Sequence, residues 1–538
     1  MTTELAARAR DLTLALVRRP SVTGTPDETS FGPWLHDQLA AWPYFAAHPQ
    51  DLHCQQTDND PHERSIVAAL VRGSGRATVV LTGHYDTVSL ADYGALAPLA
   101  CEPLALLPAL IAALDASTTP ADARAAADLR SGDWLPGRAI LDMKSGLGAA
   151  LAVLEAFAAN HDRTGNLLFL AVPDEEQLSH GMRSAAQHLP ALAAAWGLNL
   201  VAAINTDATV DTGNGSAGRA IFLGSVGKLL PTALILGCQT HVGAPFDGVS
   251  ATLLAAEIAR TIEGNPACGD PQPTDGALPP APVVLQLRDQ KPGYDVTTPA
   301  AVFLACNLLT HCLTPDAALT RFGTVVQAAL DTGMATHRAR AAQAGAAAAF
   351  PPAMVLTYAE LVARAAGRVD TAELDQIAAN PAYDQLDVAR LTTLALLRAA
   401  AISGPLAVIG FAPIYYPAAR LTDAPAHARL RAIVARVAAT PGTDDQPLVV
   451  RPFFPGISDV SFLCGQDTAA TLAAARAQTP GWDARWPIDT IARNLPTINI
   501  GPWGRDYHQR SERLYTPYAF GQLPRLLQRI CTQLVQKD

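Results

Sequence analysis

The chain has 538 residues, a length that predicts two or three domains, and 49% of its residues are apolar, enough to build a large core. Its 49 acidic and 39 basic side chains give a formal net charge of −10 at pH 7, without a basic run. This balance argues against nucleic acid or an acidic membrane surface as a partner, and it leaves a small-molecule substrate open.

The N-terminal residues Leu5–Val17 have the spacing of an amphipathic helix, and Glu4 and Asp11 interrupt any apolar core that a signal peptide would need. A second helix is predicted over Ser30–Leu39. No uncharged apolar run approaches the roughly 18 residues of a membrane-spanning helix. Eight scattered cysteines without a CxxC pair favour free thiols in a reducing compartment. We therefore expect a cytoplasmic protein.

Four short apolar runs in the first half of the chain each lead into residues that can bind a metal ion. The first run, Thr78–Leu81, is expected to pair with a strand at Ser65–Leu70. Helical patterns alternate with the runs, which predicts an α/β fold with a mainly parallel sheet whose ligands gather at the carboxyl ends of the strands. The runs and their following residues are 78–81 before His84 and Asp86, 139–141 before Asp142, 167–172 before Glu175 and Glu176, and 200–204 before Asp207.

Two segments depart from this alternation. Tyr93–Leu135 is predicted to be an insertion with a helix after Thr119-Pro120, and no chemistry is assigned to it. From 211–215 onward the pattern changes to that of a second α/β unit, inserted into the first. The elements expected there are antiparallel strands at 220–226 and 232–237, a strand at 283–287, a helix at 300–309, helices over 316–401 and a strand at 407–411.

The C-terminal part returns to the first unit, with a helix at Ala426–Val437, strands at 448–454 and 497–500, and a last helix at Leu523–Leu534. His508 follows the loop after the last strand. The predicted domains are residues 1–218 and 421–538 for a catalytic domain and 219–420 for an inserted lid.

The candidate ligands are His84, Asp142, Glu176, Asp207 and His508, a set of imidazoles and carboxylates that suits two zinc ions sharing one carboxylate. Glu175 is an additional acid that can handle the attacking water. Asp86 lies two residues beyond His84, where it can accept the imidazole N–H. Each residue alone has an ordinary explanation, such as a helix cap at Asp142 or a packed histidine at His508. Their joint occurrence favours a metal site.

The series GHYDTV (83–88), DMKSG (142–146), PDEE (173–176), NTDA (205–208) and a distant histidine resembles the dinuclear zinc peptidase and amidohydrolase family. That family includes aminoacylases, carboxypeptidase G, dipeptidases and succinyl-diaminopimelate desuccinylase. The likeness covers nearly the whole chain. It is strongest to the arginine-utilization branch, through PFFPGISDVSFL (452–463), INIGPWGRDYHQRSER (498–513) and the large middle region.

The resemblance implies a role for each matching residue. It implies that His84, Asp142, Glu176, Asp207 and His508 are ligands of two Zn²⁺, with Mn²⁺ or Co²⁺ as alternatives, and that Asp142 bridges them. It also implies that Glu175 is the general base and Asp86 the acid that orients His84. His241, in a His-Val-Gly-Ala-Pro motif, matches a lid histidine that polarises the scissile carbonyl, often across a homodimer interface.

The chain departs from the family pattern in its lid, which is longer than usual and puts the standard dimer in doubt. Arg288 and Lys291 are candidate ligands for a substrate carboxylate.

Three functions stay open. The first is hydrolysis of an amide bond in a small N-acylated amino acid, in amino-acid or arginine catabolism. The second is an aminopeptidase or dipeptidase activity on the same site. The third is a non-catalytic binding or regulatory protein on this fold, which the complete ligand set and Glu175 argue against.

Overall fold

The computed structural model describes residues 2–210, 219–270, 280–439, 448–488 and 494–536. The chain divides into two compact units, and each is composed of separated segments. The first unit contains Met1–Ser225, Ala419–Gln466 and Ala492–Asp538, and the second contains Val226–Ala418 and Asp467–Ile491. The predicted change of pattern at 211–215 lies outside the described residues.

The segment 467–491 groups with the second unit, whereas the domains predicted from the sequence place it in the catalytic part. It is attached there by hydrogen bonds to backbone groups of the rest of the second unit. Phe411 N donates to Gln478 O over 2.9 Å, and Arg485 Nε donates to Ala378 O over 2.6 Å. These partners are distant in sequence, so the local pattern of residues 467–491 carries no sign of them.

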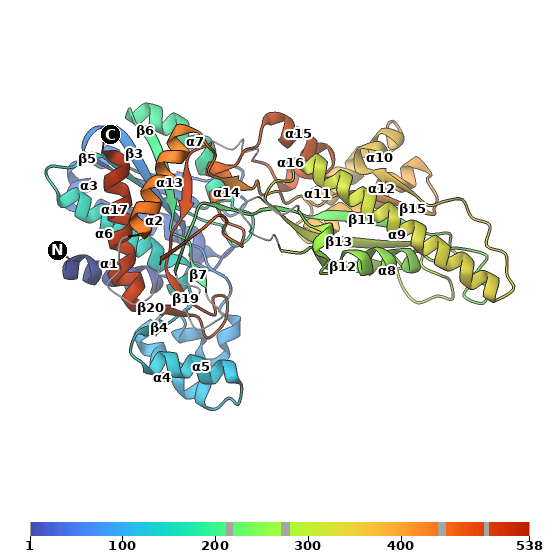
Figure 1. The fold of residues 1–538 in the computed structure, drawn as a ribbon, viewed down its shortest axis with the longest axis horizontal. Coiled ribbons are helices and arrows are strands. Elements are labelled where there is room, and N and C mark those ends of the chain that lie inside the picture. Colours follow the sequence, from blue (N-terminus) through green and yellow to red (C-terminus); the bar gives the residue numbers. More distant parts are fainter. Residues whose placement is uncertain (1, 211–218, 271–279, 440–447, 489–493, 537–538) are drawn as a thin grey trace. The chain divides into compact units, whose positions relative to one another are not determined.

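A large sheet of the first unit has the strand order β1-β2-β5-β3-β6-β18-β8-β17, and Figure 1 labels its strands β3, β5 and β6. Its centre, from β5 to β18, is parallel, and antiparallel pairs lie on both sides of it. The predicted α/β class is confirmed. The strands are β1 (Leu52–Gln56), β2 (Ser65–Arg72), β3 (Ser74–His84), β5 (Thr164–Val172), β6 (Asn199–Asn205), β8 (Arg219–Phe222), β17 (Leu448–Arg451) and β18 (Thr497–Asn499).

Part of the core of the first unit lies between this sheet and α6 (Ser145–Ala159). Val79 and Leu81 of β3 belong to the same buried cluster as Leu147 and Leu151 of α6. The i, i+4, i+7 spacing of apolar residues in α6 is that of a helix with one face toward the core. Outside the insertion at 93–135, the other α-helices of the first unit are α1 (Thr2–Val17), α2 (Pro26–Ala40), α3 (Pro43–Ala47), α7 (His180–Trp196), α13 (Pro425–Ala438), α14 (Val460–Cys464) and α17 (Leu523–Val535).

Two predictions for the first unit are wrong. The strands at 65–72 and 74–84 are not paired with each other, because β5 lies between them. The run Ala139–Leu141 is not a strand. Ala139 has a left-handed φ of 67°, and Ile140–Lys144 forms an irregular helical turn that leads into α6. An apolar run of three residues is too short to distinguish a strand from such a turn.

The insertion consists of a short helix, Ala91–Leu99, followed by α4 (Pro103–Asp115), α5 (Pro120–Arg130) and β4 (Trp134–Pro136). The helix predicted after Thr119-Pro120 is α5, whose N-terminus is capped by Thr119. The strand β4 of this insertion belongs to a small sheet with the strand order β4-β20-β19-β7. It joins β4 to β20 (Arg513–Tyr515), β19 (Trp503–Arg505) and β7 (Thr209–Val210). Two short strands, β9 (Gly224–Ser225) and β16 (Ala419–Arg420), also pair in this unit.

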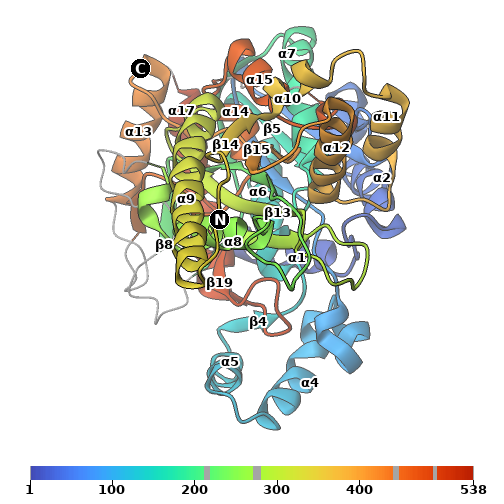
Figure 2. The same ribbon diagram turned by 90° about the vertical axis from the view of Figure 1, so that its right-hand side faces the viewer.

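The second unit is built on a sheet with the strand order β10-β13-β11-β15-β14. The strand β12 pairs with the part of β13 that β10 does not cover. The long helix α9 runs beside α8 (Figure 2). The strands are β10 (Gly227–Leu229), β11 (Pro231–Leu236), β12 (Val283–Asp289), β13 (Ala301–Thr310), β14 (Met354–Thr357) and β15 (Leu406–Phe411). The helices are α8 (Ala251–Ile262), α9 (Pro315–Gln343), α10 (Tyr358–Ala365), α11 (Thr371–Ala379), α12 (Gln385–Ala400), α15 (Ala469–Ala477) and α16 (Trp482–Arg485).

Three expectations for the second unit are also wrong. The segment 300–309 is the strand β13 and not a helix, because it pairs with β11 on one side and with β12 on the other. The strands expected at 220–226 and 232–237 do not pair, since β8 belongs to the large sheet of the first unit and β11 lies between β13 and β15. Residues 316–401 also contain a strand, β14. Uninterrupted apolar runs fit a buried strand as well as a buried helix, so periodicity alone does not separate the two.

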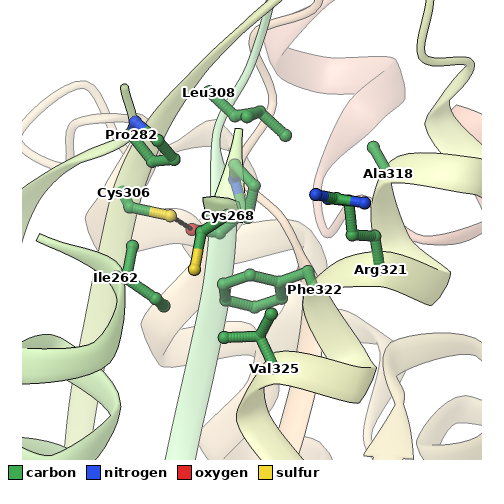
Figure 3. Close-up of a pocket in the computed structure, with 10 residues that line it drawn as sticks. Ile262, Cys268, Pro282, Cys306, Leu308, Ala318, Arg321, Phe322 and Val325 are labelled. Carbon is green, nitrogen blue, oxygen red and sulfur yellow. Dashed lines mark hydrogen bonds between the residues drawn. The ribbon is translucent and has the colours of Figure 1, made fainter. Parts of the chain in front are cut away.

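A small cavity of about 10 Å³ lies inside the second unit, between Cys268, Cys306 and Phe322 (Figure 3). It is too small for a ligand, since even a water molecule needs roughly 10–15 Å³ of this kind of space. Among the described residues, no helix combines the length and the apolar character needed to cross a membrane.

Candidate metal centre

Three neighbouring strands of the large sheet bring candidate ligands to one edge. His84 is the last residue of β3, Glu175 and Glu176 follow β5, and Asp207 follows β6. Because these strands are parallel, their carboxyl ends meet at the same edge of the sheet, which is where α/β proteins bind ligands. The two remaining ligands come from elsewhere in the first unit, Asp142 from the turn before α6 and His508 from the loop between β19 and β20.

The five predicted ligands form two groups that share one residue. In the first group, His84 Nε2 lies 3.3 Å from Asp142 Oδ1 and 3.7 Å from Asp207 Oδ1. In the second, His508 Nε2 lies 3.2 Å from Asp142 Oδ2 and 3.1 Å from Glu176 Oε1. Within each group the ligand atoms are all within 4.8 Å of one another. Asp142 therefore turns one oxygen to each group, as a bridging carboxylate does.

The donor atoms of this centre fit divalent cations. Imidazole nitrogen and carboxylate oxygen are ligands of zinc, and they also suit manganese and cobalt. His84 Nε2 and Asp142 Oδ1 are both buried and make no hydrogen bond with the described residues. Buried polar atoms are normally satisfied, so two unsatisfied atoms that face each other indicate a place for a cation.

Close packing of the backbone holds Asp142 and Asp207 together. A side-chain Cβ at Gly146, at the start of α6, would lie 2.1 Å from Thr206 O. Only glycine lets the helix that follows Asp142 approach the segment that carries Asp207 so closely.

Asp86 connects the end of β3 to the turn that carries Glu175 and Glu176. Its carboxylate accepts hydrogen bonds from Glu175 N over 3.1 Å and Glu176 N over 3.2 Å, and from the Thr23 hydroxyl over 2.9 Å. His84 Nδ1 lies 3.4 Å from Asp86 Oδ1 and 3.1 Å from its carbonyl oxygen. The sequence predicts a role for Asp86 in orienting the imidazole, and the structure adds its two backbone contacts.

Glu175 is held in a buried, negatively charged environment. Its Oε2 lies 3.9 Å from His84 Nε2. Burial raises the pKa of the Glu175 carboxyl well above its usual range, and the neighbouring charges of Asp207 and Asp459 raise it further, although His84 opposes this shift. Cations bound at the two ligand groups would neutralise the negative charge of these neighbouring carboxylates.

A buried ionic network supports the turn that carries Glu175. Asp174, directly before it, has a left-handed φ of 70°. Arg64 Nη1 donates to Asp174 Oδ1 over 2.6 Å, and Glu28 Oε1 accepts from Asp174 N over 3.0 Å. Arg64 also donates to both carboxylate oxygens of Asp60, at 2.7 and 2.8 Å. The sequence analysis missed this network, because Asp174 is more than a hundred residues away from both Arg64 and Glu28.

Replacing Arg64 by methionine is expected to destabilise the first unit. The side chains of Arg64, Glu28 and Asp174 are at most 2% exposed, so the change leaves buried carboxylates without their cation. Breaking a buried ion pair in this way typically costs about 3–5 kcal/mol. The free energy of unfolding in urea measures the effect. Arg18→Met is the control, because its ion pair with Glu102 is about half exposed and contributes little.

A second buried pair holds the turn that carries Asp142. Glu512 Oε1 accepts from Leu141 N over 3.2 Å and from Asp142 N over 3.4 Å. Arg138 Nη1 donates to the other oxygen of Glu512 over 2.9 Å, and both side chains are 1% exposed. Burial raises the pKa of the Glu512 carboxyl to about 8, while Arg138 opposes the shift. Glu512 lies in the motif at 498–513, and the sequence alone did not predict its role.

Asp459 is another buried acid of the centre that sequence reasoning missed. It is 1% exposed and lies in the motif at 452–463. Burial raises the pKa of its carboxyl to about 8, with His84 opposing the shift and Asp86 and Asp207 adding to it. The preceding residue, Ser458, is held by Asn205 Nδ2 over 3.0 Å, two positions before Asp207.

The other predicted site residues belong to the second unit. His241 is exposed, and its Nδ1 accepts a hydrogen bond from Gly243 N over 3.0 Å. Arg288 lies 3.6 Å from Asp387 Oδ1, and Lys291 pairs with Asp295 and donates to Thr297 O over 2.8 Å. The metal ligands, Asp86 and Glu175 all belong to the first unit.

The chain belongs to the peptidase family M20/M25/M40, whose family model matches residues 114–481. It is therefore an enzyme of the metallopeptidase class, as the motifs predicted.

Two relatives from Bacillus subtilis extend over the whole chain. The uncharacterized protein YqjN is 31% identical over 98% of this chain and 96% of its own length. Protein RocB is 29% identical over 99% of this chain and 95% of its own length. Succinyl-diaminopimelate desuccinylase 2 of Shewanella loihica is 28% identical over 46% of this chain and 54% of its own length. These similarities agree with the predicted family.

Among solved structures, a tripeptidase from Staphylococcus aureus is similar to this chain with a TM-score of 0.54 at 14% identity, covering 99% of both chains. Aminopeptidase PepT from Bacillus cereus gives the same TM-score at 13% identity and the same coverage. These likenesses support the fold.

Proposed function

We propose that the protein hydrolyses an amide bond in a small substrate, an N-acyl amino acid or a short peptide, at the metal centre of the first unit. The observation that carries this proposal is Asp142, which turns one carboxylate oxygen to each of two ligand groups while Glu175 lies buried beside them. A shared carboxylate suits a pair of cations, and a non-ligand acid next to that pair suits general base catalysis.

Each residue of the centre has a distinct task in this proposal. His84, Asp142 and Asp207 would hold one Zn²⁺, and Asp142, Glu176 and His508 the other. When bound, the ions supply Lewis-acid activation of a water molecule and of the scissile carbonyl. Glu175 takes a proton from the attacking water and delivers it to the leaving amine. Asp86 fixes the imidazole of His84 and the backbone of the Glu175–Glu176 turn.

Two substrate classes are separated by one experiment. The similarity to a succinyl-diaminopimelate desuccinylase favours N-acyl amino acids, and the fold shared with a tripeptidase and an aminopeptidase favours peptides. The purified protein is tested with zinc, manganese and cobalt against acyl-amino acids and di- and tripeptides. We expect acyl-amino acids to be cleaved faster. Faster cleavage of peptides would establish the second function, and no cleavage of either class would contradict both.

The proposed setting is amino-acid catabolism, with arginine as the first candidate, because the motifs at 452–463 and 498–513 resemble the arginine-utilization branch of the family. Acyl derivatives of arginine belong in the panel for this reason. Equal rates for acyl-arginine and for acyl derivatives of unrelated amino acids would argue against a specific link to arginine.

His241 is proposed to donate a hydrogen bond to the carbonyl oxygen of the substrate. We expect His241→Ala to lower turnover about 10²–10³-fold, which is the usual loss when one donor to an oxyanion is removed. The metal content should stay unchanged, because His241 is not a ligand in this proposal. Unchanged turnover in this variant would remove His241 from the mechanism.

Mixing two inactive variants tests whether His241 acts in a partner subunit. His241→Ala and Glu175→Gln chains are combined under conditions that allow subunits to exchange. If a homodimer supplies His241 in trans, a mixed dimer has one complete site and activity returns. If His241 acts within its own chain, the mixture stays inactive.

A further inference from the structure

The helix α5 of the insertion contacts the loop that carries His508. Both segments belong to the first unit, and Figure 1 shows α5 close to β4 and β20. Asp128 Oδ2 accepts hydrogen bonds from Arg505 Nη1 over 2.7 Å and from Arg513 Nε and Nη2 over 2.9 and 2.7 Å. One aspartate thus joins two arginines that lie on opposite sides of His508 in the sequence.

A second aspartate of α5 reaches the same loop between these two arginines. Arg510 Nη2 donates to Asp122 Oδ2 over 3.0 Å. Arg124 of α5 lies 4.0 Å from Asp506 Oδ1. Asp506 in turn pairs with Arg513 and accepts from the Ser511 hydroxyl over 3.0 Å. Residues 505–513 are therefore tied to one helix at several points along their length.

The loop needs such ties because of its backbone and its exposure. Asp506 and His508 have left-handed φ values of 57° and 61°, which residues with a Cβ seldom adopt unless their surroundings impose them. The His508 side chain is 40% exposed, whereas Glu176 and Asp142 in the same ligand group are 7% and 11% exposed. The core covers those two carboxylates and holds them in place, whereas it leaves His508 the most exposed of the three ligands.

We propose that α5 is a positioning element for His508. Through Asp122 and Asp128 it sets the affinity of the Asp142–Glu176–His508 group for its cation, separately from the affinity of the His84–Asp142–Asp207 group. This inference rests on the proposed two-metal centre. It gives the insertion a role in metal binding, although none of its residues is a ligand.

The contacts of α5 favour an effect on the His508 group. Its ties reach the loop of His508, while the ligands His84 and Asp207 stand at the ends of strands in the large sheet. Residues that orient a ligand from behind typically change metal affinity about 10–100-fold when they are replaced. An effect confined to one cation would distinguish positioning by α5 from a general loss of stability.

The test is a zinc titration of Asp128→Asn in competition with a chromophoric chelator. Asparagine keeps the size of the side chain and removes the charge that both arginines share. We expect wild-type protein to bind two ions, and the variant to bind one of them with about 10–100-fold lower affinity. The control is Asp115→Asn, which breaks the exposed ion pair of α4 with Arg130 and leaves the loop untouched.

Repeating the comparison in a His508→Ala background identifies the ion. In that background Asp128→Asn should no longer change the affinity of the remaining ion, because the ligand that α5 positions is gone. Asp122→Asn is a milder second variant, because its partner Arg510 is 42% exposed. The same titration is made with this variant if Asp128→Asn does not fold.

The outcomes separate this inference from the proposed function. Wild-type protein that binds fewer than two ions would overturn the two-metal centre and the role of α5 together. Two ions bound with unchanged affinities in the variants would overturn the role of α5 alone. An equal loss of affinity with and without His508 would also overturn it, because the effect would then not pass through His508.

Discussion

Glu175→Gln is expected to retain both metal ions and the native fold while its turnover falls by at least about 10²–10⁴-fold. Glutamine has the size of glutamate, but its amide cannot take a proton from water. The site keeps all five ligands, so metal binding does not depend on this change. Turnover on the substrate found in the panel and metal content by elemental analysis are measured on the same preparation.

Glu176→Gln is the matched control, since the same chemical change is made one residue further along the turn. Glu176 Oε1 lies 3.1 Å from His508 Nε2, whereas Glu175 lies near the His84 group. Glu176→Gln should therefore weaken the binding of one ion. If Glu175→Gln lost metal and Glu176→Gln kept it, the roles of the two acids would be exchanged.

Asp142→Ala is expected to lose most of the bound metal. Replacing any other single ligand should lose less. Its Oδ1 lies 3.3 Å from His84 Nε2 and its Oδ2 lies 3.2 Å from His508 Nε2, so the change removes a ligand from both groups. Elemental analysis after gel filtration measures the ions that remain per chain.

Two variants calibrate this result. His84→Ala and His508→Ala each remove a ligand from one group only, so each should lose mainly one ion. Full retention of metal in Asp142→Ala would contradict the bridging role. A loss no larger than that of His508→Ala would show that Asp142 serves one ion and not two.

The positions of the candidate ligands could be predicted because the sheet imposes a simple rule. His84, Glu176 and Asp207 each follow an apolar run that forms a parallel strand, and parallel strands bring their carboxyl ends to one edge. The run at 139–141 also predicted Asp142 at that edge, although this run is not a strand, and the family motifs added His508. The structure places all five side chains in one centre.

The supporting contacts could not be predicted, because they join segments that are distant in sequence. Arg64 reaches Asp174 over 110 positions, and Arg138 reaches Glu512 over 374. A charged residue in a turn gives no sign of its partner. The same limit explains the error at 300–309, where the neighbouring strands β11 and β12, and not the local sequence, determine that the segment is a strand.

The division of each unit into separate segments has a consequence for synthesis of the chain. The second unit needs residues up to Ile491, whereas the first lacks β18 and His508 until later residues have left the ribosome. Domains tend to fold as units while the chain grows. We therefore expect the second unit to become complete first. The strand β18, which joins β6 to β8 in the large sheet, and the last metal ligand are synthesised after the second unit is complete.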